Sequence, residues 1–177
     1  MPRDRGDIAF EDINKLFDKI RSELDVKGDI DIMFKPEGVK GLILVDLRNV
    51  IKNLPPEKAE NISNTIWGKI IESFDKGELL SVSKIRRIHK IVPTDIDDIE
   101  KQAEFFAKYI DSEWKIDIHT KKIIDRTKTI RSVASHINQP VNLKNPRYIL
   151  YIEVIGPTIT VMYLVDTKNV RDTILRY

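Results

Sequence analysis

The last third of the chain alternates between strand-like and helix-like residue patterns. Apolar and polar residues alternate over Trp114–Thr120 and again over Thr158–Val165, after a Gly156-Pro157 turn, while Tyr148–Ile155 is a nearly continuous apolar run. Between Trp114–Thr120 and Tyr148–Ile155, apolar residues recur at helical spacing after the basic run Lys121–Lys128. Period-2 alternation is typical of strands, and a spacing of three to four residues is typical of helices. The pattern therefore predicts a strand, a basic helix and a two-stranded hairpin, in that order.

The first half of the chain predicts a second unit of mixed structure. Apolar residues repeat every three to four positions from Phe10 to Leu24 and from Ala59 to Phe74, which predicts two helices. Asp29–Phe34 and the short apolar run Gly41–Leu47 predict strands, and Leu79–Val92 predicts a strand interrupted by a bulge or a bend. Helix, two strands, helix and strand are the elements of a ferredoxin-like unit. The fold class expected from the sequence is therefore α/β, of the α+β kind.

Pro93 marks the expected boundary between the two units. We expect an N-terminal ferredoxin-like domain over residues 1–92 and a second domain over residues 93–177, packed together because no long linker separates them. Thr94 is the predicted N-cap of a helix whose apolar face runs from Ile96 to Ile110.

The chain contains few of the residues with which enzymes usually do chemistry. It has no cysteine and only seven glycines, and none of them forms a phosphate-binding loop. His89, His119 and His136 lack the spacing of metal ligands, and their polar surroundings predict surface positions. We expect neither a cofactor nor a catalytic site. The sequence has no apolar run of 18 residues and no N-terminal signal pattern, so we expect a cytoplasmic protein without a membrane partner.

Positive charge is concentrated in one part of the chain. Residues 84–147 carry a net charge of +5 and the remaining residues one of −3. Two clusters account for the excess, one over residues 84–90 and one over residues 115–131. The second cluster surrounds a predicted helix start, where free backbone N–H groups and the helix dipole favour phosphate. These clusters indicate a surface that binds a polyanion, although an ordinary solvated face of a charge-rich protein remains an alternative.

Several separate motifs resemble the THUMP domain of RNA-modification proteins. They are the strand Trp114–His119 with its basic continuation, the segment Val141-Asn-Leu-Lys-Asn-Pro-Arg147, and the strand that follows it. Upstream, Gly38–Val45 and Arg87–Pro93 resemble the N-terminal segment of stand-alone THUMP proteins similar to the adaptor of the tRNA cytidine acetyltransferase. Asn142 stands where the family usually has aspartate. The resemblance spans roughly residues 38–165.

The resemblance implies a non-catalytic protein that binds the acceptor end of tRNA and presents its D-arm region to an acetyltransferase that forms N4-acetylcytidine. Two alternatives stay open: an RNA-binding subunit of another tRNA-modifying enzyme, a methyltransferase or thiolase, and a protein-interaction module without an RNA role. Charge and resemblance together predict the RNA-binding residues. These are Lys84, Arg86, Arg87, Lys90, Lys121, Lys122, Arg126, Lys128, Arg131, Asn145 and Arg147.

Overall fold

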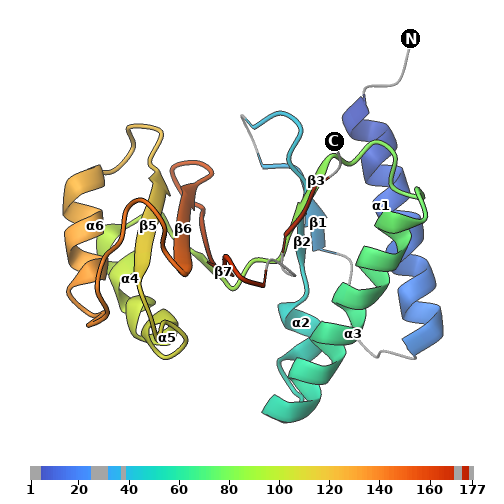
Figure 1. The fold of residues 1–177 in the computed structure, drawn as a ribbon. Helices are drawn as coiled ribbons and strands as arrows, with labels where there is room; N and C mark the ends of the chain where they lie inside the picture. The colour runs from blue at the N-terminus through green and yellow to red at the C-terminus, as the bar shows by residue number, and fades with distance from the viewer. Residues whose placement is uncertain (1–4, 25–31, 37–38, 170–172, 176–177) are drawn as a thin grey trace. The chain divides into compact units, whose positions relative to one another are not determined.

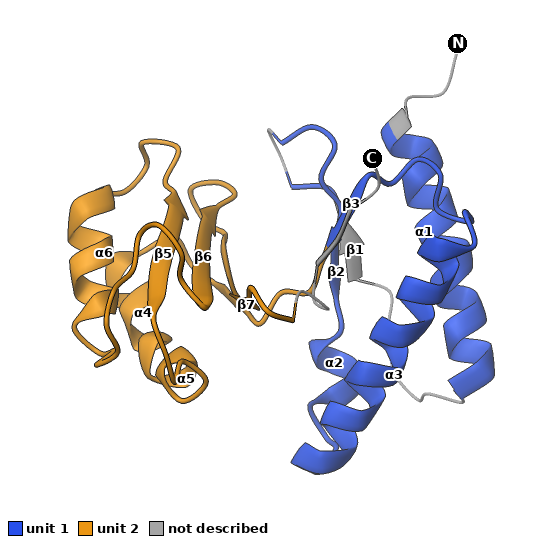
Figure 2. Ribbon diagram, in the orientation of Figure 1, with its two compact units in different colours: residues 1–85, 175–177 blue, residues 86–174 orange. Residues whose placement is uncertain are grey.

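A computed structural model describes residues 5–24, 32–36, 39–169 and 173–175 of the chain. The chain forms two compact units (Figure 2). Unit 1 comprises residues 1–85 and 175–177, and unit 2 comprises residues 86–174. The division therefore lies between Ile85 and Arg86 rather than at the expected Val92–Pro93 junction. The reason is that the strand Lys90–Val92 pairs with a strand of unit 2.

Unit 1 is built on two long helices. Apolar side chains that include Phe17 and Ile20 on the first helix and Ile66 and Phe74 on the second are buried, as their helical spacing predicted. Pro56 occupies the first turn of the second helix, where its missing N–H is tolerated. The elements are α1 (Arg5–Leu24), β1 (Ile32–Phe34), β2 (Leu44–Asp46), α2 (Arg48–Ile51), α3 (Pro56–Asp75) and β3 (Lys84–Arg86).

The strands of unit 1 are shorter than the sequence suggested. β1 and β2 pair antiparallel, with Ile32 opposite Asp46, and residues 29–31 of the expected first strand lie outside the described residues. The predicted strand Leu79–Val92 is interrupted, as its irregular pattern indicated. Residues 77–81 form turns, and the rest divides into β3 and β4 (Lys90–Val92). β3 pairs with β8 (Thr173–Leu175), a strand that the sequence analysis did not predict.

Unit 2 contains a four-stranded mixed sheet in the order β4-β7-β6-β5 (Figure 1). β5 and β6 are parallel, and β7 is antiparallel to both β6 and β4. This confirms the predicted sequence of strand, helix and hairpin. The remaining elements are α4 (Ile96–Lys101), α5 (Ala103–Ala107), β5 (Trp114–His119), α6 (Arg126–Ala134), β6 (Tyr148–Val154) and β7 (Thr160–Asp166).

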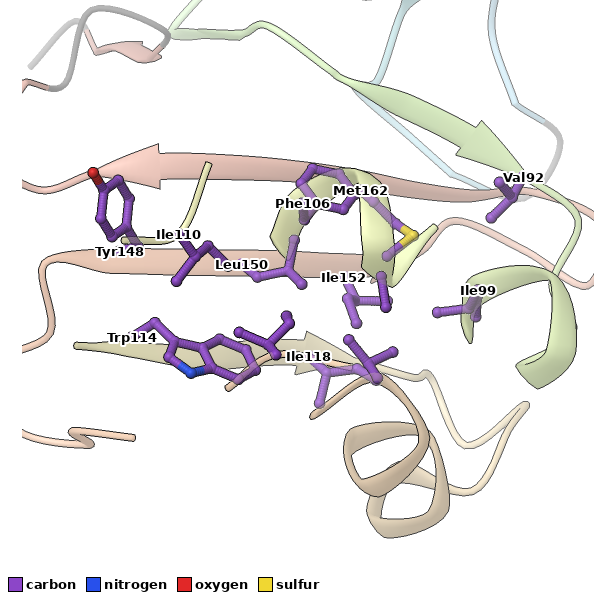
Figure 3. Close-up of a cluster of buried hydrophobic side chains, with 13 residues drawn as sticks. Val92, Ile99, Phe106, Ile110, Trp114, Ile118, Tyr148, Leu150, Ile152 and Met162 are labelled. Carbon is purple, nitrogen blue, oxygen red and sulfur yellow. The ribbon is translucent and has the colours of Figure 1, made fainter. Parts of the chain in front are cut away.

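The helices of unit 2 pack on one face of this sheet and form its hydrophobic core (Figure 3). Leu150 and Ile152 of β6 and Met162 of β7 are completely buried there, together with Ile99 of α4 and Phe106 of α5. Because successive strand residues point to opposite faces, Tyr151 and Tyr163 lie on the other face of the sheet. We call this second face the helix-free face.

Three local expectations for unit 2 were wrong. Asp95, not Thr94, caps α4, with its carboxylate accepting the Asp97 and Asp98 N–H groups. The Thr94 hydroxyl instead donates to the Gly156 carbonyl oxygen (2.7 Å). The expected single helix is divided between α4 and α5.

His89 is partly buried, not a freely exposed surface residue as its polar surroundings predicted. The Nδ1 of its side chain accepts the Leu164 backbone N–H at 3.1 Å. The backbone N–H of His89 donates to the Met162 carbonyl oxygen, also at 3.1 Å. The His89 side chain thereby satisfies the Leu164 N–H of β7. His89 itself lies directly before β4 in the chain.

Candidate nucleic-acid interface

A tight turn with an unusual backbone follows β5. The turn Thr120–Ile123 closes with a hydrogen bond from the Ile123 N–H to the Thr120 carbonyl oxygen at 3.0 Å. Its central residues Lys121 and Lys122 have φ angles of +50° and +60°, as in a type I′ turn. Such turns favour asparagine and glycine, because the left-handed conformation costs other L-residues roughly 1–2 kcal/mol each. Two lysines give no sequence signal for this turn, and the sequence analysis did not predict it.

Helix α6 starts directly after the turn. Asp125 is its N-cap, and the Asp125 carboxylate accepts the Lys128 N–H at 2.8 Å. The Asp125 carbonyl oxygen accepts the Thr129 hydroxyl at 2.7 Å, which places Thr129 in the core and leaves Arg126 exposed at the first helical position. The cap therefore fixes where the basic residues of the first turn lie.

Four of the predicted RNA-binding residues gather at this place: Lys121, Lys122, Arg126 and Lys128, which we call the basic end. All four are exposed, and none forms an ion pair within the described residues. The Lys121 ammonium group donates to the Ile155 carbonyl oxygen at 3.3 Å, beside the end of β6. Arg131 lies further along α6, also exposed and also without an ion pair among the described residues. The basic end thus presents uncompensated positive charge at a helix start.

Two of the predicted arginines are instead bound to acidic residues of unit 2. Arg147 donates through Nε and Nη2 to the two carboxylate oxygens of Asp166, each at 3.1 Å. These hydrogen bonds lower the pKa of Asp166 and raise that of Arg147. Arg86 forms an ion pair with Glu153, and its guanidinium lies 5.1 Å from the centre of the Tyr163 ring. Both arginines therefore stabilise the fold with the same charge that suggested an RNA contact.

The other members of the first basic cluster are also in contact with the protein. The Lys90 ammonium group lies 4.2 Å from the centre of the Phe105 ring, in a cation–π contact. Lys84 belongs to unit 1 and Arg87 to unit 2, and both interact with other parts of the chain. All four basic residues of 84–90 thus contact other groups of the protein, and Arg86 is held by a carboxylate.

Asn145 lies at the opposite end of the sheet from the basic end. In the parallel pair, Trp114 is opposite Tyr148 and His119 opposite Glu153, so the segment before Tyr148 and the turn after His119 are separated by the length of the strands. At about 3.3 Å per residue, six residues separate the two groups by roughly 20 Å. The structure does not bring Asn145 and Arg147 together with the basic end.

Asn142 organises the turn that contains Asn145. Its side-chain oxygen accepts the N–H groups of Lys144 (3.1 Å) and Asn145 (3.0 Å), and its side-chain nitrogen donates to Glu113 Oε2 at 2.8 Å. An aspartate cannot donate to Glu113. Asn142 therefore makes a contact with Glu113 that an aspartate at this position could not make.

Within the described residues, no three His, Asp or Glu side chains are grouped so that they could hold a metal ion. None of the helices in that part of the chain has the length and apolar character needed to cross a membrane.

Comparisons with known proteins agree with the predicted fold class. No family model matches the sequence, and no curated protein matches it. PH1313 from Pyrococcus horikoshii is similar in structure, with a TM-score of 0.55 and 14% sequence identity over 93% of this chain. The chain spans about half of PH1313, covering 50% of its length. A 4-thiouridine synthetase, solved with RNA and ATP, has a TM-score of 0.48 and 11% identity over 88% of this chain and 38% of its own. The likeness to PH1313 confirms the α+β class.

Proposed function

We propose that this chain is a tRNA-binding protein that contacts the RNA through the basic end of unit 2. The observation that carries the proposal is the group of four exposed basic side chains that have no ion-pair partner in the described part of the chain. They surround the start of α6, where the Asp125 carboxylate accepts the Lys128 N–H and the Arg126 and Thr127 N–H groups have no partner within the helix. Phosphate is favoured at such a place, and neutralising several phosphates at once gives most of the affinity of RNA-binding surfaces.

The strained turn supports the same proposal. Lys121 and Lys122 hold left-handed backbone conformations that asparagine and glycine would adopt at lower cost. Unfavourable backbone conformations persist mainly where the surrounding structure or a function requires them. The Lys121 ammonium group donates to the Ile155 carbonyl oxygen, but both lysine side chains are exposed and their positive charges suit a phosphate backbone.

The role of the protein in modification is proposed from its sequence. The motifs around Trp114 and Asn145-Pro146 resemble stand-alone THUMP proteins, and the chain contains no glycine-rich loop for a nucleotide cofactor. We infer a non-catalytic cytoplasmic adaptor that holds tRNA for a separate enzyme, the acetyltransferase that forms N4-acetylcytidine. An adaptor of this kind accelerates modification by holding the tRNA close to the active site of the enzyme.

Binding of tRNA by charge-reversed variants tests the interface. Changing Lys121, Lys122 and Arg126 to glutamate should abolish binding, because repulsion replaces phosphate neutralisation. For the unchanged protein, log K should fall against log salt with a slope of about −3.5 to −4.5 if the basic end and Arg131 neutralise about five phosphates. Fluorescence anisotropy of labelled tRNA measures both quantities.

A charge-matched variant of unit 1 provides the control. Lys40, Lys52 and Lys58 are exposed, and changing them to glutamate alters the net charge by the same amount. This control should retain most of the affinity, and both triple variants should keep the melting temperature of the parent, since exposed charges add little to stability. Equal loss of binding in the two variants would assign the effect to net charge alone and remove the basic end as the interface.

A further inference from the structure

One edge strand of the unit 2 sheet, β5, is only partly paired on its outer side. In the strand order β4-β7-β6-β5, β4 and β5 lie at the two edges (Figure 1). An edge strand presents backbone N–H and C=O groups without a partner in the sheet, and native proteins usually keep such strands short or cover them. β4 is short, with three residues, whereas β5 has six. β5 is therefore the edge along which a further strand has room to pair.

The start of β5 is covered by a short segment of the same unit. The Trp114 N–H donates to the Pro140 carbonyl oxygen at 3.1 Å, and the Trp114 carbonyl oxygen accepts the Asn142 N–H at 3.0 Å. These hydrogen bonds pair Trp114 with Val141 in a single parallel bridge. The chain then turns at Asn142, whose side-chain oxygen accepts the Asn145 N–H at 3.0 Å. The outer side of β5 thus accepts an added segment as a strand, but this segment ends after one bridge.

The next backbone groups along the same side of β5 are open. Backbone groups of alternate residues point to the same side of a strand, so those of Ile116 and Ile118 point outward like those of Trp114. In the described part of the chain, the outward N–H and C=O groups of Ile116 and Ile118 have no protein partner. We call these groups the free edge. They are the hydrogen-bonding positions that a further strand of the sheet would use.

The side chains along the free edge are polar on one face of the sheet and apolar on the other. Lys115, Asp117 and His119 lie on the helix-free face. Asp117 Oδ1 lies 3.4 Å from His119 Nε2, whereas Lys115 forms no ion pair within the described residues. On the opposite face, Ile116 is partly exposed and Val141 is 59% exposed. A strand that fits here alternates apolar with polar residues, and an acidic residue among the polar ones matches Lys115.

An extended polypeptide has hydrogen-bonding groups that match the free edge, and a phosphate backbone does not. A strand offers alternating C=O and N–H groups along one side, which pair with both kinds of group on the edge. Phosphate oxygens accept hydrogen bonds but do not donate to carbonyl oxygens. The free edge is therefore suited to a protein rather than to the RNA that we propose for the basic end.

The charges along β5 disfavour a second copy of this chain as the added strand. Antiparallel pairing of two free edges places Ile116 opposite Ile118 of the other copy. Asp117 then lies directly opposite the same residue of the other copy, and like charges in this position are destabilising. A different protein, with an acidic residue beside Lys115, avoids this repulsion.

We propose that the free edge binds an extended segment of a different protein as an added strand of the sheet. In this segment, apolar residues that lie beside Ile116 alternate with polar residues that include an acidic side chain for Lys115. The proposal goes beyond the RNA-binding function and does not depend on it, because the backbone groups that carry it are not part of the basic end.

A peptide of this chemistry tests the free edge with the full chain. The probe is a fluorescein-labelled peptide, Thr-Val-Glu-Val-Thr-Val-Glu-Val-Thr, whose binding is followed by fluorescence anisotropy. Ile116→Pro should weaken binding about tenfold or more, because proline lacks the N–H donor and its ring lies where the added strand packs. The fold should tolerate this change, since proline is accepted in edge strands where the N–H points outward. Ile116→Val, which keeps the N–H, should bind the peptide like the parent.

Methylated peptides show whether binding uses backbone hydrogen bonds. One analogue carries an N-methyl group on the amide of every valine, and the other carries it on the amides of the polar residues. Only alternate amides of a strand face its neighbour, so one analogue should lose binding and the other should keep it. Equal affinity of the two analogues would overturn the added strand.

Lys115→Glu provides a test that leaves the backbone groups of β5 unchanged. It should weaken binding of the glutamate peptide about 2- to 30-fold, because a like-charged pair replaces an oppositely charged pair across the strands. It should strengthen binding of a second peptide in which lysine replaces both glutamates. If Lys115→Glu leaves the affinities for the two peptides unchanged, the added strand does not lie beside Lys115 and the proposal is wrong.

The remaining outcomes separate the proposal from its alternatives. If Ile116→Pro leaves peptide binding unchanged and a change of Lys121 and Lys122 to glutamine abolishes it, the basic end holds the peptide by charge and the proposal is wrong. Absence of binding by both peptides would also overturn it. Self-association of the parent that Ile116→Pro abolishes, measured by analytical ultracentrifugation, would assign the free edge to a second copy instead. Ile116→Pro should bind tRNA like the parent, so the failure of either proposal leaves the other standing.

Discussion

At the scale of single residues, some arginines of this protein are bound to carboxylates and others are not. Arg147 is held by Asp166 in two hydrogen bonds and Arg86 by Glu153, whereas Arg126 has no ion pair within the described residues. The difference is the presence of a carboxylate from another strand, not anything in the neighbouring sequence. Uncompensated charge is what an anionic partner can use, so Arg126 and the lysines of the basic end carry the proposed function.

The strained turn predicts that relieving its strain raises the free energy of unfolding but weakens tRNA binding. Changing Lys121 to asparagine and Lys122 to glycine should raise the free energy of unfolding by about 1 kcal/mol, because both residues accept positive φ at low cost. The same variant should bind tRNA more weakly, since two charges are lost. Urea unfolding measures the first effect and anisotropy the second.

A pair of glutamine substitutions separates the two effects. Changing both lysines to glutamine removes the same charges but leaves the backbone strained. This control should lose affinity to the same extent without gaining stability. Equal stability of the two double variants would show that the turn costs the fold nothing.

Asp46 predicts how unit 1 responds to acid. Its carboxylate accepts the Arg48 N–H at 2.9 Å and Arg48 Nε at 3.0 Å, and these hydrogen bonds hold its pKa below the ordinary value of 3.8. The unfolded chain therefore takes up the proton first, so the contribution to stability is complete above about pH 5 and is lost progressively as the pH falls to the folded-state pKa. Asp46→Asn should flatten the loss of stability between about pH 5 and pH 3, measured by urea unfolding at each pH.

At the scale of elements, the two ends of the unit 2 sheet differ in structure. The end beside α6 presents the basic end to solvent. The other end is closed by hydrogen bonds, in which Glu113 accepts from Asn142 through its side chain and from Arg147 and Tyr148 through its carbonyl oxygen. The Asn-Pro turn therefore organises the entry into β6, and the structure gives it no shared surface with the basic end.

The Asn142 turn predicts a pairwise effect with Glu113. Asn142→Asp should lower the free energy of unfolding by about 0.5–1.5 kcal/mol, because a hydrogen bond is lost and two carboxylates face each other. Glu113→Gln in the Asn142→Asp background should restore most of the loss, since the glutamine amide donates where the asparagine did. A double-mutant cycle by urea unfolding measures the coupling. Additive effects of the two substitutions would contradict the contact.

At the scale of the whole molecule, two units share one short chain. Unit 2 contains the proposed RNA contacts and unit 1 is a mixed helical and strand unit without a proposed site. The predicted packing of one unit on the other stays a prediction. The chain spans about half the length of PH1313.

The adaptor proposal predicts a division of labour between two proteins. The purified chain should leave tRNA unmodified with acetyl-coenzyme A or S-adenosylmethionine. Added to the acetyltransferase, it should raise N4-acetylcytidine formation by holding the tRNA in place. Mass spectrometry of nucleosides from each reaction measures the product. Modification by this chain alone would end the adaptor proposal, and an effect on a different nucleoside would point to a methyltransferase or thiolase as partner.

The sequence by itself determined the features that depend on neighbouring residues. The alternation in β5, β6 and β7 specified the faces of the unit 2 sheet, because strand side chains point to alternate sides whatever the partner strand is. The spacing of apolar residues specified the cores of α1 and α3 in the same way. The basic run before α6 predicted the basic end, since the charged residues of the basic end lie close together in the chain.

Only the tertiary structure decided which strands and charges meet. Arg86 and Glu153 are 67 residues apart, and His89 and Leu164 are 75 residues apart, so no local pattern pairs them. The boundary between the units lies before β4, not after it as predicted, for the same reason: β4 pairs with β7. Ion pairs and strand partners depend on the register of segments distant in sequence. The positive φ of Lys121 and Lys122 is imposed where β5 must turn sharply into α6, against the preference of lysine itself.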